Sequence, residues 1–172
     1  MLSSARAHTR VKNEVIEVLS GKDANTILEV INEAARVYQG AIPDDCYNEP
    51  YMSEEELHQE MRGMIFFGWR DKGKIVGVIG FQKAQDVTLT PHAYVLPECQ
   101  SKGIGAKLLS HVQHLTKTKR LLVGTWADAA WAIDLYQKHG FIRMADKDRL
   151  LKKYWDIPQR QIGASVVMSI EI

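Results

Sequence analysis

Several features that would define a protein class are missing from this chain of 172 residues. Its two cysteines, Cys46 and Cys99, are too few for a disulfide framework and lack the spacing of zinc ligands. We therefore expect free thiols in a reducing compartment and no bound metal. No apolar run approaches the roughly 20 residues of a transmembrane helix, and the N-terminus lacks the apolar core of a signal peptide. We expect a cytoplasmic protein without a membrane partner.

A strong excess of one charge is also missing. The chain has 22 Lys and Arg residues against 21 Asp and Glu residues, a formal net charge of +1. No overall field therefore draws it to nucleic acid. The only local asymmetry is an acidic stretch formed by Asp44, Asp45, Glu49, Glu54, Glu55, Glu56 and Glu60. We interpret this stretch as a solvated helix face, with the attraction of a cationic amine as the alternative.

Length and composition indicate one globular domain over residues 1–172. The apolar fraction of 45% and the charged fraction of 25% are those of an ordinary globular protein. A chain of this length buries a sizeable core. Internal repeats and low-complexity tracts are absent from the sequence, so nothing divides it into smaller units.

The hydrophobic pattern predicts a mixed α/β fold. Ser53 followed by Glu56 is a capping box that marks the start of a helix. Strands are expected at 15–19, 64–69, 75–81, 87–96, 121–126, from 141 onward and at 165–170. Helices are expected from 23 for about 15 residues, from 53 onward, at 104–115 and at 129–139. This order is an antiparallel meander that leads into a β-α-β unit.

The most informative segment is 95–109, which reads as the end of a strand, a Gly-rich loop and the start of a helix. Gln100, Gly103 and Gly105 have Q-x-x-G-x-G spacing. Glycine lets the backbone come close to a ligand, and the first N–H groups of a helix form an anion site. Lys102 adds a positive charge to the loop. These features predict a phosphate-binding loop, with an ordinary strand–helix turn as the alternative.

Two other phosphate loops fit this segment less well. A dinucleotide fingerprint requires a third glycine where Leu108 stands. A P-loop requires Gly-Lys followed by Ser or Thr, which the segment lacks.

The loop resembles the acyl-coenzyme A loop of the GNAT N-acetyltransferase superfamily, whose pattern is [QR]-x-x-G-x-[GA]. Residues 132–141 are similar to a second family segment, A-x-x-L-Y-x-K-x-G-F. The two motifs stand in the family's order, and the resemblance covers nearly the whole chain, most strongly from about Gly77 to Phe141. It implies the GNAT acyl-CoA N-acyltransferase fold, in which helices flank a central, mostly antiparallel sheet splayed between strands 4 and 5. Here these strands are 87–96 and 121–126.

The resemblance implies that acetyl-CoA is the co-substrate. The backbone groups of Val95 and Leu96 would pair with its pantetheine arm. The implied cofactor-binding residues of the loop and helix are Gln100, Ser101, Lys102, Gly103, Ile104, Gly105, Ala106 and Lys107. The chain departs from the family at Ala129, where many relatives have an Asn that contacts the cofactor. We expect that polar contact to be missing here.

The implied chemistry is direct attack of a primary amine on the thioester in a ternary complex. A backbone N–H near Val95 would stabilise the oxyanion. Tyr136 occupies the position of the family's general acid, with simple packing on the sheet as the alternative. His92 is the candidate general base, because the ordinary pKa of imidazole, about 6.5, suits proton removal near neutrality. Asp86, Glu98 or a water chain are the alternatives.

The acceptor is either a small-molecule amine or a peptide amine, and the sequence has no signature that decides between them. Tyr47, Tyr51 and Trp126 are candidate walls of its pocket, although each could equally be a packing residue. Two other functions stay open, a non-catalytic acyl-CoA-binding sensor and an acetyltransferase of protein or peptide amines. Because relatives often dimerise through C-terminal strands, the strand at 166–170 is a candidate edge for a homodimer.

Overall fold

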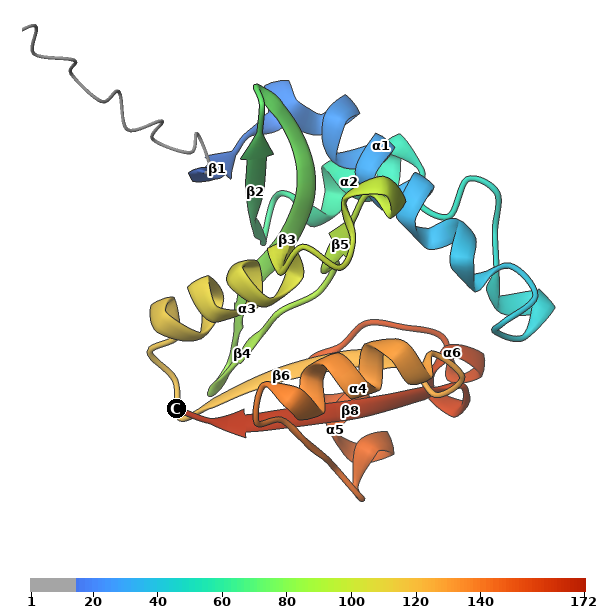
Figure 1. The fold of residues 1–172 in the computed structure, drawn as a ribbon. Helices are drawn as coiled ribbons and strands as arrows, with labels where there is room; N and C mark the ends of the chain where they lie inside the picture. The colour runs from blue at the N-terminus through green and yellow to red at the C-terminus, as the bar shows by residue number, and fades with distance from the viewer. Residues whose placement is uncertain (1–14) are drawn as a thin grey trace, which may run out of the picture.

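The computed structural model describes residues 15–172, which form a mixed α/β fold (Figure 1). The strands are β1 (Val15–Leu19), β2 (Ile65–Asp71), β3 (Lys74–Ala84), β4 (Val87–Leu89), β5 (Tyr94–Val95), β6 (Arg120–Trp126), β7 (Ile142–Arg143) and β8 (Ser165–Glu171). The helices are α1 (Ala24–Ala35), α2 (Glu54–Glu60), α3 (Ile104–Leu115), α4 (Ala130–Lys138), α5 (Lys147–Tyr154) and α6 (Gln159–Gly163).

The sheet has the strand order β1-β2-β3-β4-β6-β8-β7, and β5 pairs with β3 outside this sequence. The pair of β4 and β6 is parallel, and the other pairs are antiparallel. The mostly antiparallel sheet predicted from the sequence is therefore confirmed. The first part of β3 pairs with β2 and β5, whereas its end at 82–84 pairs with β4. The sheet consequently opens into two parts beyond β3 (Figure 1).

The predicted continuous strand at 87–96 is wrong in one respect, because residues 90–93 interrupt it. The Gly80 N–H donates to the Pro91 carbonyl oxygen at 2.7 Å, and the Thr90 hydroxyl donates to the Gly80 carbonyl oxygen at 3.0 Å. The Thr90 N–H bonds to the Leu122 carbonyl oxygen of β6 at 3.0 Å. The chain thus leaves β6 at Thr90 and returns to β3 as β5, which opens the predicted splay between β5 and β6.

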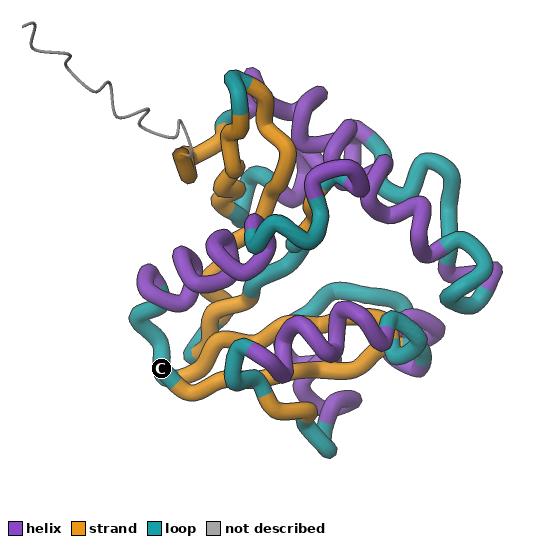
Figure 2. Tube along the Cα trace, viewed as in Figure 1, coloured by secondary structure: helices purple, strands orange, loops and turns teal. Residues whose placement is uncertain are grey.

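Helices cover the sheet on both faces. Neighbouring side chains of a strand point to opposite faces, and on β2 these are Phe66 and Phe67. The Phe67 ring lies 4.7 Å from the ring of His111 on α3, and the Phe66 ring lies 6.0 Å from that of His92. Helix α3 and His92 are therefore on opposite faces. The long loop between α1 and α2 runs at the edge of the molecule beside the opening (Figure 2).

Most helix ends agree with the sequence pattern. The capping box of α2 is formed, because the Glu56 N–H donates to the Ser53 hydroxyl at 3.2 Å and the Ser53 N–H to the Glu56 carboxylate at 2.7 Å. Gly140 follows α4 with a φ of +89°, a conformation that favours glycine after a helix. Within residues 15–172, no helix combines the length and apolar character needed to cross a membrane. Cys46 and Cys99 are free thiols, as expected.

Two features of the C-terminal third differ from what the sequence predicts. The segment at 144–164, where no helix or strand is expected, contains α5 and α6. Helix α5 buries Leu150, Leu151 and Tyr154 among charged residues, so its apolar stripe is short. The prediction that 166–170 forms a sheet edge is wrong, because β8 pairs with β6 along its length and with β7 at Met168 and Ser169.

We predict that Gly80→Ala destabilises the fold by about 1–3 kcal/mol through overpacking. A Cβ atom at Gly80 would lie 2.6 Å from the Pro91 carbonyl oxygen and 2.7 Å from the sulfur of Met64. Gly21→Ala is the matched control, because nothing lies within 4 Å of a Cβ atom there. Urea unfolding measures both variants, and equal midpoints would contradict this account of the strand interruption.

Candidate functional site

The outer edge of β5 offers backbone groups to a ligand. Val95 pairs with Gly77 on β3, and the next N–H, that of Leu96, donates to the Val76 carbonyl oxygen at 2.8 Å. Because bonding groups alternate sides along an antiparallel strand, Val95 turns its N–H and C=O away from β3. On that side β5 has no strand partner within residues 15–172. The expectation of free groups on both residues is thus wrong for the Leu96 N–H, which is already bonded.

The Gln100 side chain reaches back to this edge. Its amide Nε2 donates to the Val95 carbonyl oxygen at 3.0 Å. Because Gln100 itself is exposed, a donor group of a ligand can replace its amide at the Val95 carbonyl oxygen. The Val95 backbone and the Gly-rich loop are therefore joined in one local structure.

The loop presents an uncapped helix start. Gly103 is the N-cap residue of α3 with a φ of +80°, and no side chain caps the helix. A Cβ atom at Gly103 would have nothing within 4 Å, and within residues 15–172 the N–H groups of Ile104, Gly105 and Ala106 have no backbone partner. Unpaired N–H groups at the positive end of a helix dipole suit a phosphate group. The loop therefore fits the pyrophosphate of coenzyme A.

The two lysines near the Gly-rich loop, Lys102 on the loop and Lys107 on α3, lie in different surroundings. Ser101 and Lys102 are exposed beside Gly103, and Ser101 has a φ of +63°. The ammonium of Lys107 instead lies 4.9 Å from the ring centroid of Trp69 on β2. Lys102 is thus the better-placed cation for a phosphate, and a cofactor contact of Lys107 stays a prediction.

Tyr136 lies on α4, close to the place where α3, α4 and β5 meet. A Cβ atom at Gly105 would lie 3.8 Å from the Val95 side chain and 3.9 Å from that of Leu135. Tyr136 is buried, with its ring 5.6 Å from that of Phe141. Burial, assisted by the nearby Tyr38, raises the pKa of Tyr136 above its ordinary value. The phenol is therefore protonated at neutral pH and has a proton to donate.

His92 is not in a strand but in the interruption between β4 and β5, with a φ of +58°. Its Nε2 contacts the carboxylate of Glu60 at the end of α2. Its ring lies between those of Phe66 and Tyr94, at 6.0 Å and 6.4 Å. A carboxylate at Nε2 favours the tautomer with its proton there, which leaves Nδ1 as the basic nitrogen.

The other base candidates are less suitable. The Tyr154 hydroxyl donates to Asp86 at 2.7 Å and lowers the pKa of this carboxyl group. Glu98 is exposed on the turn that precedes the Gly-rich loop. His92 therefore stays the candidate base.

A cavity of about 570 Å³ adjoins the splay. It is lined from both flanks, by Tyr94 of β5 and by Trp126 of β6, and His92 contributes to the same wall. Of the predicted pocket residues, Tyr51 and Trp126 line it, whereas Tyr47 packs behind Tyr51 with ring centroids 6.1 Å apart.

Sequence reasoning missed further lining residues, namely Tyr38, Glu60, Tyr94, Tyr154 and Trp155. Tyr94 was detectable, since side chains two residues apart on a strand share a face and His92 was already a candidate. Tyr154 and Trp155 belong to the segment 144–164, which the family resemblance places on the acceptor side but for which no element was predicted.

Tyrosine rings form a cluster at the inner end of this cavity. The ring centroid of Tyr38 lies 5.4 Å from that of Tyr51 and 6.4 Å from that of Tyr94. The indole N–H of Trp126 donates to the Tyr51 hydroxyl at 2.8 Å. Burial, together with the neighbouring Tyr51, raises the pKa of Tyr38 to about 12. Burial also raises the pKa of Tyr51 and that of Tyr94.

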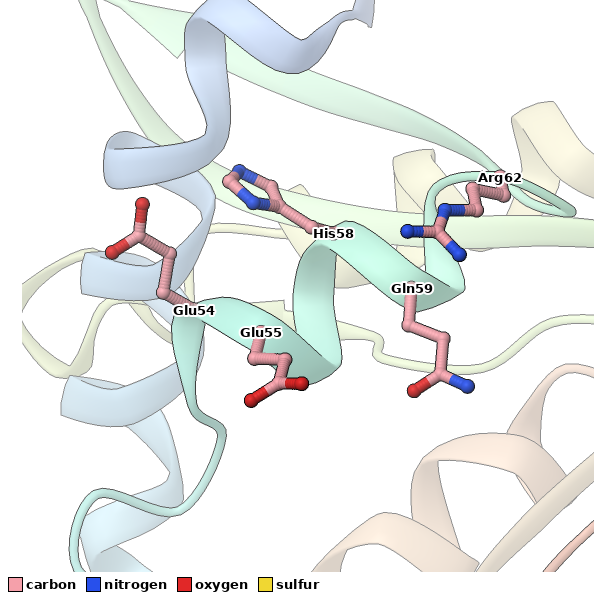
Figure 3. Close-up of a pocket in the computed structure, with 5 residues that line it drawn as sticks. All are labelled: Glu54, Glu55, His58, Gln59 and Arg62. Carbon is pink, nitrogen blue, oxygen red and sulfur yellow. The ribbon is translucent and has the colours of Figure 1, made fainter.

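A second hollow, of about 610 Å³, lies over the exposed side of α2. It is lined by Glu54, Glu55, His58, Gln59 and Arg62. These side chains fan out from one helix and its C-terminal end rather than converging (Figure 3). The hollow is therefore a surface depression without an opposing wall, and the cavity beside the splay is the functional-site candidate.

Comparison with known proteins agrees with this geometry. Residues 62–143 match the sequence model of the acetyltransferase (GNAT) domain. The UPF0157 protein YqkA of Bacillus subtilis (strain 168) is 30% identical over 154 residues, which are 86% of this chain and 45% of that protein. The chain thus spans about half the length of this curated relative.

Solved structures share the fold. The PaiA N-acetyltransferase of Thermoplasma acidophilum, in complex with coenzyme A, superposes with a TM-score of 0.71 at 21% identity, covering 92% of this chain and 99% of that one. The ribosomal-protein-S18-alanine N-acetyltransferase of Escherichia coli gives a TM-score of 0.67 at 20% identity, covering 92% and 94%. Together these findings show that residues 62–143 match the acetyltransferase (GNAT) domain and that the chain has the fold of these GNAT acetyltransferases.

We predict that Tyr38, Tyr51, Tyr94 and Tyr136 stay mostly protonated at pH 10 in the folded protein. Because the pKa of Tyr38 is raised from 10 to about 12, its contribution to stability is complete below pH 10 and is lost as the pH rises from 10 to 12. Near-ultraviolet absorbance of tyrosinate measures the titration. The same protein in guanidinium chloride is the control, and all six tyrosines should ionise near pH 10 there. If the folded protein gave the same titration curve as the protein in guanidinium chloride, the burial of these four tyrosines would be disproved.

Proposed function

We propose that this protein transfers an acetyl group from acetyl-CoA to a primary amine within a ternary complex. The observation that carries the proposal is the position of three features at one opening of the sheet. These are the outward backbone of Val95, the uncapped helix start at Gly103, and helix α4, which carries Tyr136 and whose Leu135 side chain lies close to Gly105. The match of residues 62–143 to the acetyltransferase (GNAT) domain supports the same function.

The parts of acetyl-CoA match these features in order. The pyrophosphate suits the N–H groups after Gly103, with Lys102 as the adjacent cation. An amide N–H of the pantetheine arm suits the backbone C=O of Val95, as in an added strand, and the Val95 N–H is left for the carbonyl oxygen of the thioester. Bound there, the cofactor supplies an activated acetyl thioester, and the cavity lined by Tyr94 and Trp126 receives the amine from the other side.

The residues of the chain then have separate tasks in the transfer. His92 accepts a proton from the amine, because only the neutral amine has a free electron pair. As the C–N bond forms, the Val95 N–H stabilises the negative charge on the carbonyl oxygen. As the C–S bond breaks, Tyr136 donates its proton to the departing sulfur. The nitrogen loses its second proton as the amide forms, and this proton restores the Tyr136 phenol.

Titration calorimetry with acetyl-CoA tests the binding step, with NAD and ATP as control ligands. We expect selective binding by the natural sequence and at least about a tenfold loss, which is about 1.4 kcal/mol, for Gly103→Ala. Gly73→Ala is the matched control, since Gly73 has a φ of +82° and also nothing within 4 Å of a Cβ atom. Both variants carry the same backbone strain, but only Gly103 adjoins the proposed phosphate site. Equal affinities for the two variants, or no binding by the folded protein, would refute the loop assignment.

Tyr136→Phe tests the catalytic step. We predict that turnover falls roughly ten- to a thousandfold, the range for a lost general acid, while the dissociation constant of acetyl-CoA stays the same. Release of free coenzyme A thiol measures turnover. Binding without turnover by the natural sequence would favour the sensor function, which Ala129, buried where many relatives have a polar side chain, leaves open.

A further inference from the structure

The cavity beside the splay has aromatic side chains on both of its flanks. Six of its 22 lining residues are Tyr or Trp, whereas Phe, Trp and Tyr together make up 8% of the chain. Tyr38, Tyr51 and Tyr94 come from one side of the opening, and Trp126, Tyr154 and Trp155 from the other. Its volume of about 570 Å³ lies within the usual range of small-molecule sites.

The polar groups of these aromatic residues are largely satisfied within the protein. The Trp126 indole donates to the Tyr51 hydroxyl at 2.8 Å, and the Tyr154 hydroxyl donates to Asp86 at 2.7 Å. The hydroxyl groups of Tyr38 and Tyr51 interact with that of Tyr94. These aromatic residues therefore offer a ligand mainly their ring faces, while Gln59, Gln82, Thr125, Gln161 and Ser165 contribute polar groups to the same lining.

The charge of the lining has one sign. Glu56, Glu60 and Asp156 contribute carboxylates, and none of the 22 lining residues is Lys or Arg. His92, the single imidazole in the lining, has its Nε2 against the Glu60 carboxylate. A cation is attracted by these carboxylates and by the ring faces, whereas an anionic group on the ligand meets repulsion.

Resting on the proposed acetyl transfer, we propose that the acceptor is a small arylalkylamine, a primary amine on a short chain that carries an aromatic ring. The ammonium enters by attraction to the carboxylates, and the ring packs between the two aromatic walls. A peptide amine is the competing acceptor, because β4 pairs with β6 only at Leu121 and Leu122, and the backbone of β6 beyond these residues borders the opening. A flexible polyamine would leave the ring faces without a matching surface.

A matched set of amines tests this assignment, with acetyl transfer measured as release of coenzyme A thiol. We expect kcat/KM for phenethylamine to exceed that for butylamine by about tenfold, which is about 1.4 kcal/mol of ring packing. Phenylalanine, which adds only a carboxylate to phenethylamine, should fall below phenethylamine by about a hundredfold because of like-charge repulsion. Spermidine and a tripeptide with a free N-terminus complete the set.

Trp155→Leu connects the preference to the cavity. We expect it to raise KM for phenethylamine about tenfold and to leave KM for butylamine unchanged, with butylamine as the internal control. An unchanged melting temperature and an unchanged acetyl-CoA affinity exclude misfolding. Phenethylamine should also quench the tryptophan fluorescence of the protein without acetyl-CoA, which reports binding independently of transfer.

The outcomes separate the two proposals. Transfer to butylamine, spermidine or the tripeptide that equals or exceeds transfer to phenethylamine overturns the arylalkylamine assignment and leaves acetyl transfer intact. Binding of acetyl-CoA with no transfer to any amine overturns the proposed function, and the arylalkylamine assignment with it. Equal rates for phenethylamine and phenylalanine disprove the role of the carboxylates.

Discussion

The site depends on the hydrogen bonds that hold the interruption at 90–93. Gly80 bonds to Pro91 and Thr90, and Thr90 bonds to Leu122 on β6. These bonds move the chain from one half of the sheet to the other, so that β4 lies against β6 while β5 lies against β3. Without the interruption, a continuous strand would pair with both neighbours and close the sheet. Backbone hydrogen bonds therefore create the opening that the proposed reaction requires, and side chains only line it.

Sequence reasoning succeeded where a local rule controls the structure. The Gly-rich loop, the capping box of α2 and the apolar stripe of α3 each lie within a few neighbouring residues, and the structure forms them where predicted. The two motifs also lie on the predicted elements. Such features depend on residue spacing and on local conformational preference, both of which can be inferred from the sequence.

The rest depended on contacts between distant segments. The partner of His92 is Glu60, on a helix 32 positions earlier in the chain, and no spacing rule connects the two. The interruption of the strand was not predicted, because residues 90–93 are held by bonds to Gly80 and β6 rather than by a local turn signal. Helix α5 was missed because its three buried residues stand among charged ones. The acidic stretch proved to be divided, since Glu56 and Glu60 line the cavity while Glu54 and Glu55 face outward.

The short distance along the chain from His92 to Val95 has a mechanical consequence. Both residues belong to one segment that is fixed to β3 at Gly80 and Leu96, whereas the opposite flank, with Trp126, belongs to β6. A breathing motion of the two halves would therefore widen or narrow the slot for the acceptor without separating the base from the oxyanion donor. The alignment of His92 with Val95 and the width of the pocket are therefore set by different parts of the fold. Acceptor preference can change through the β6 side while these two residues stay aligned.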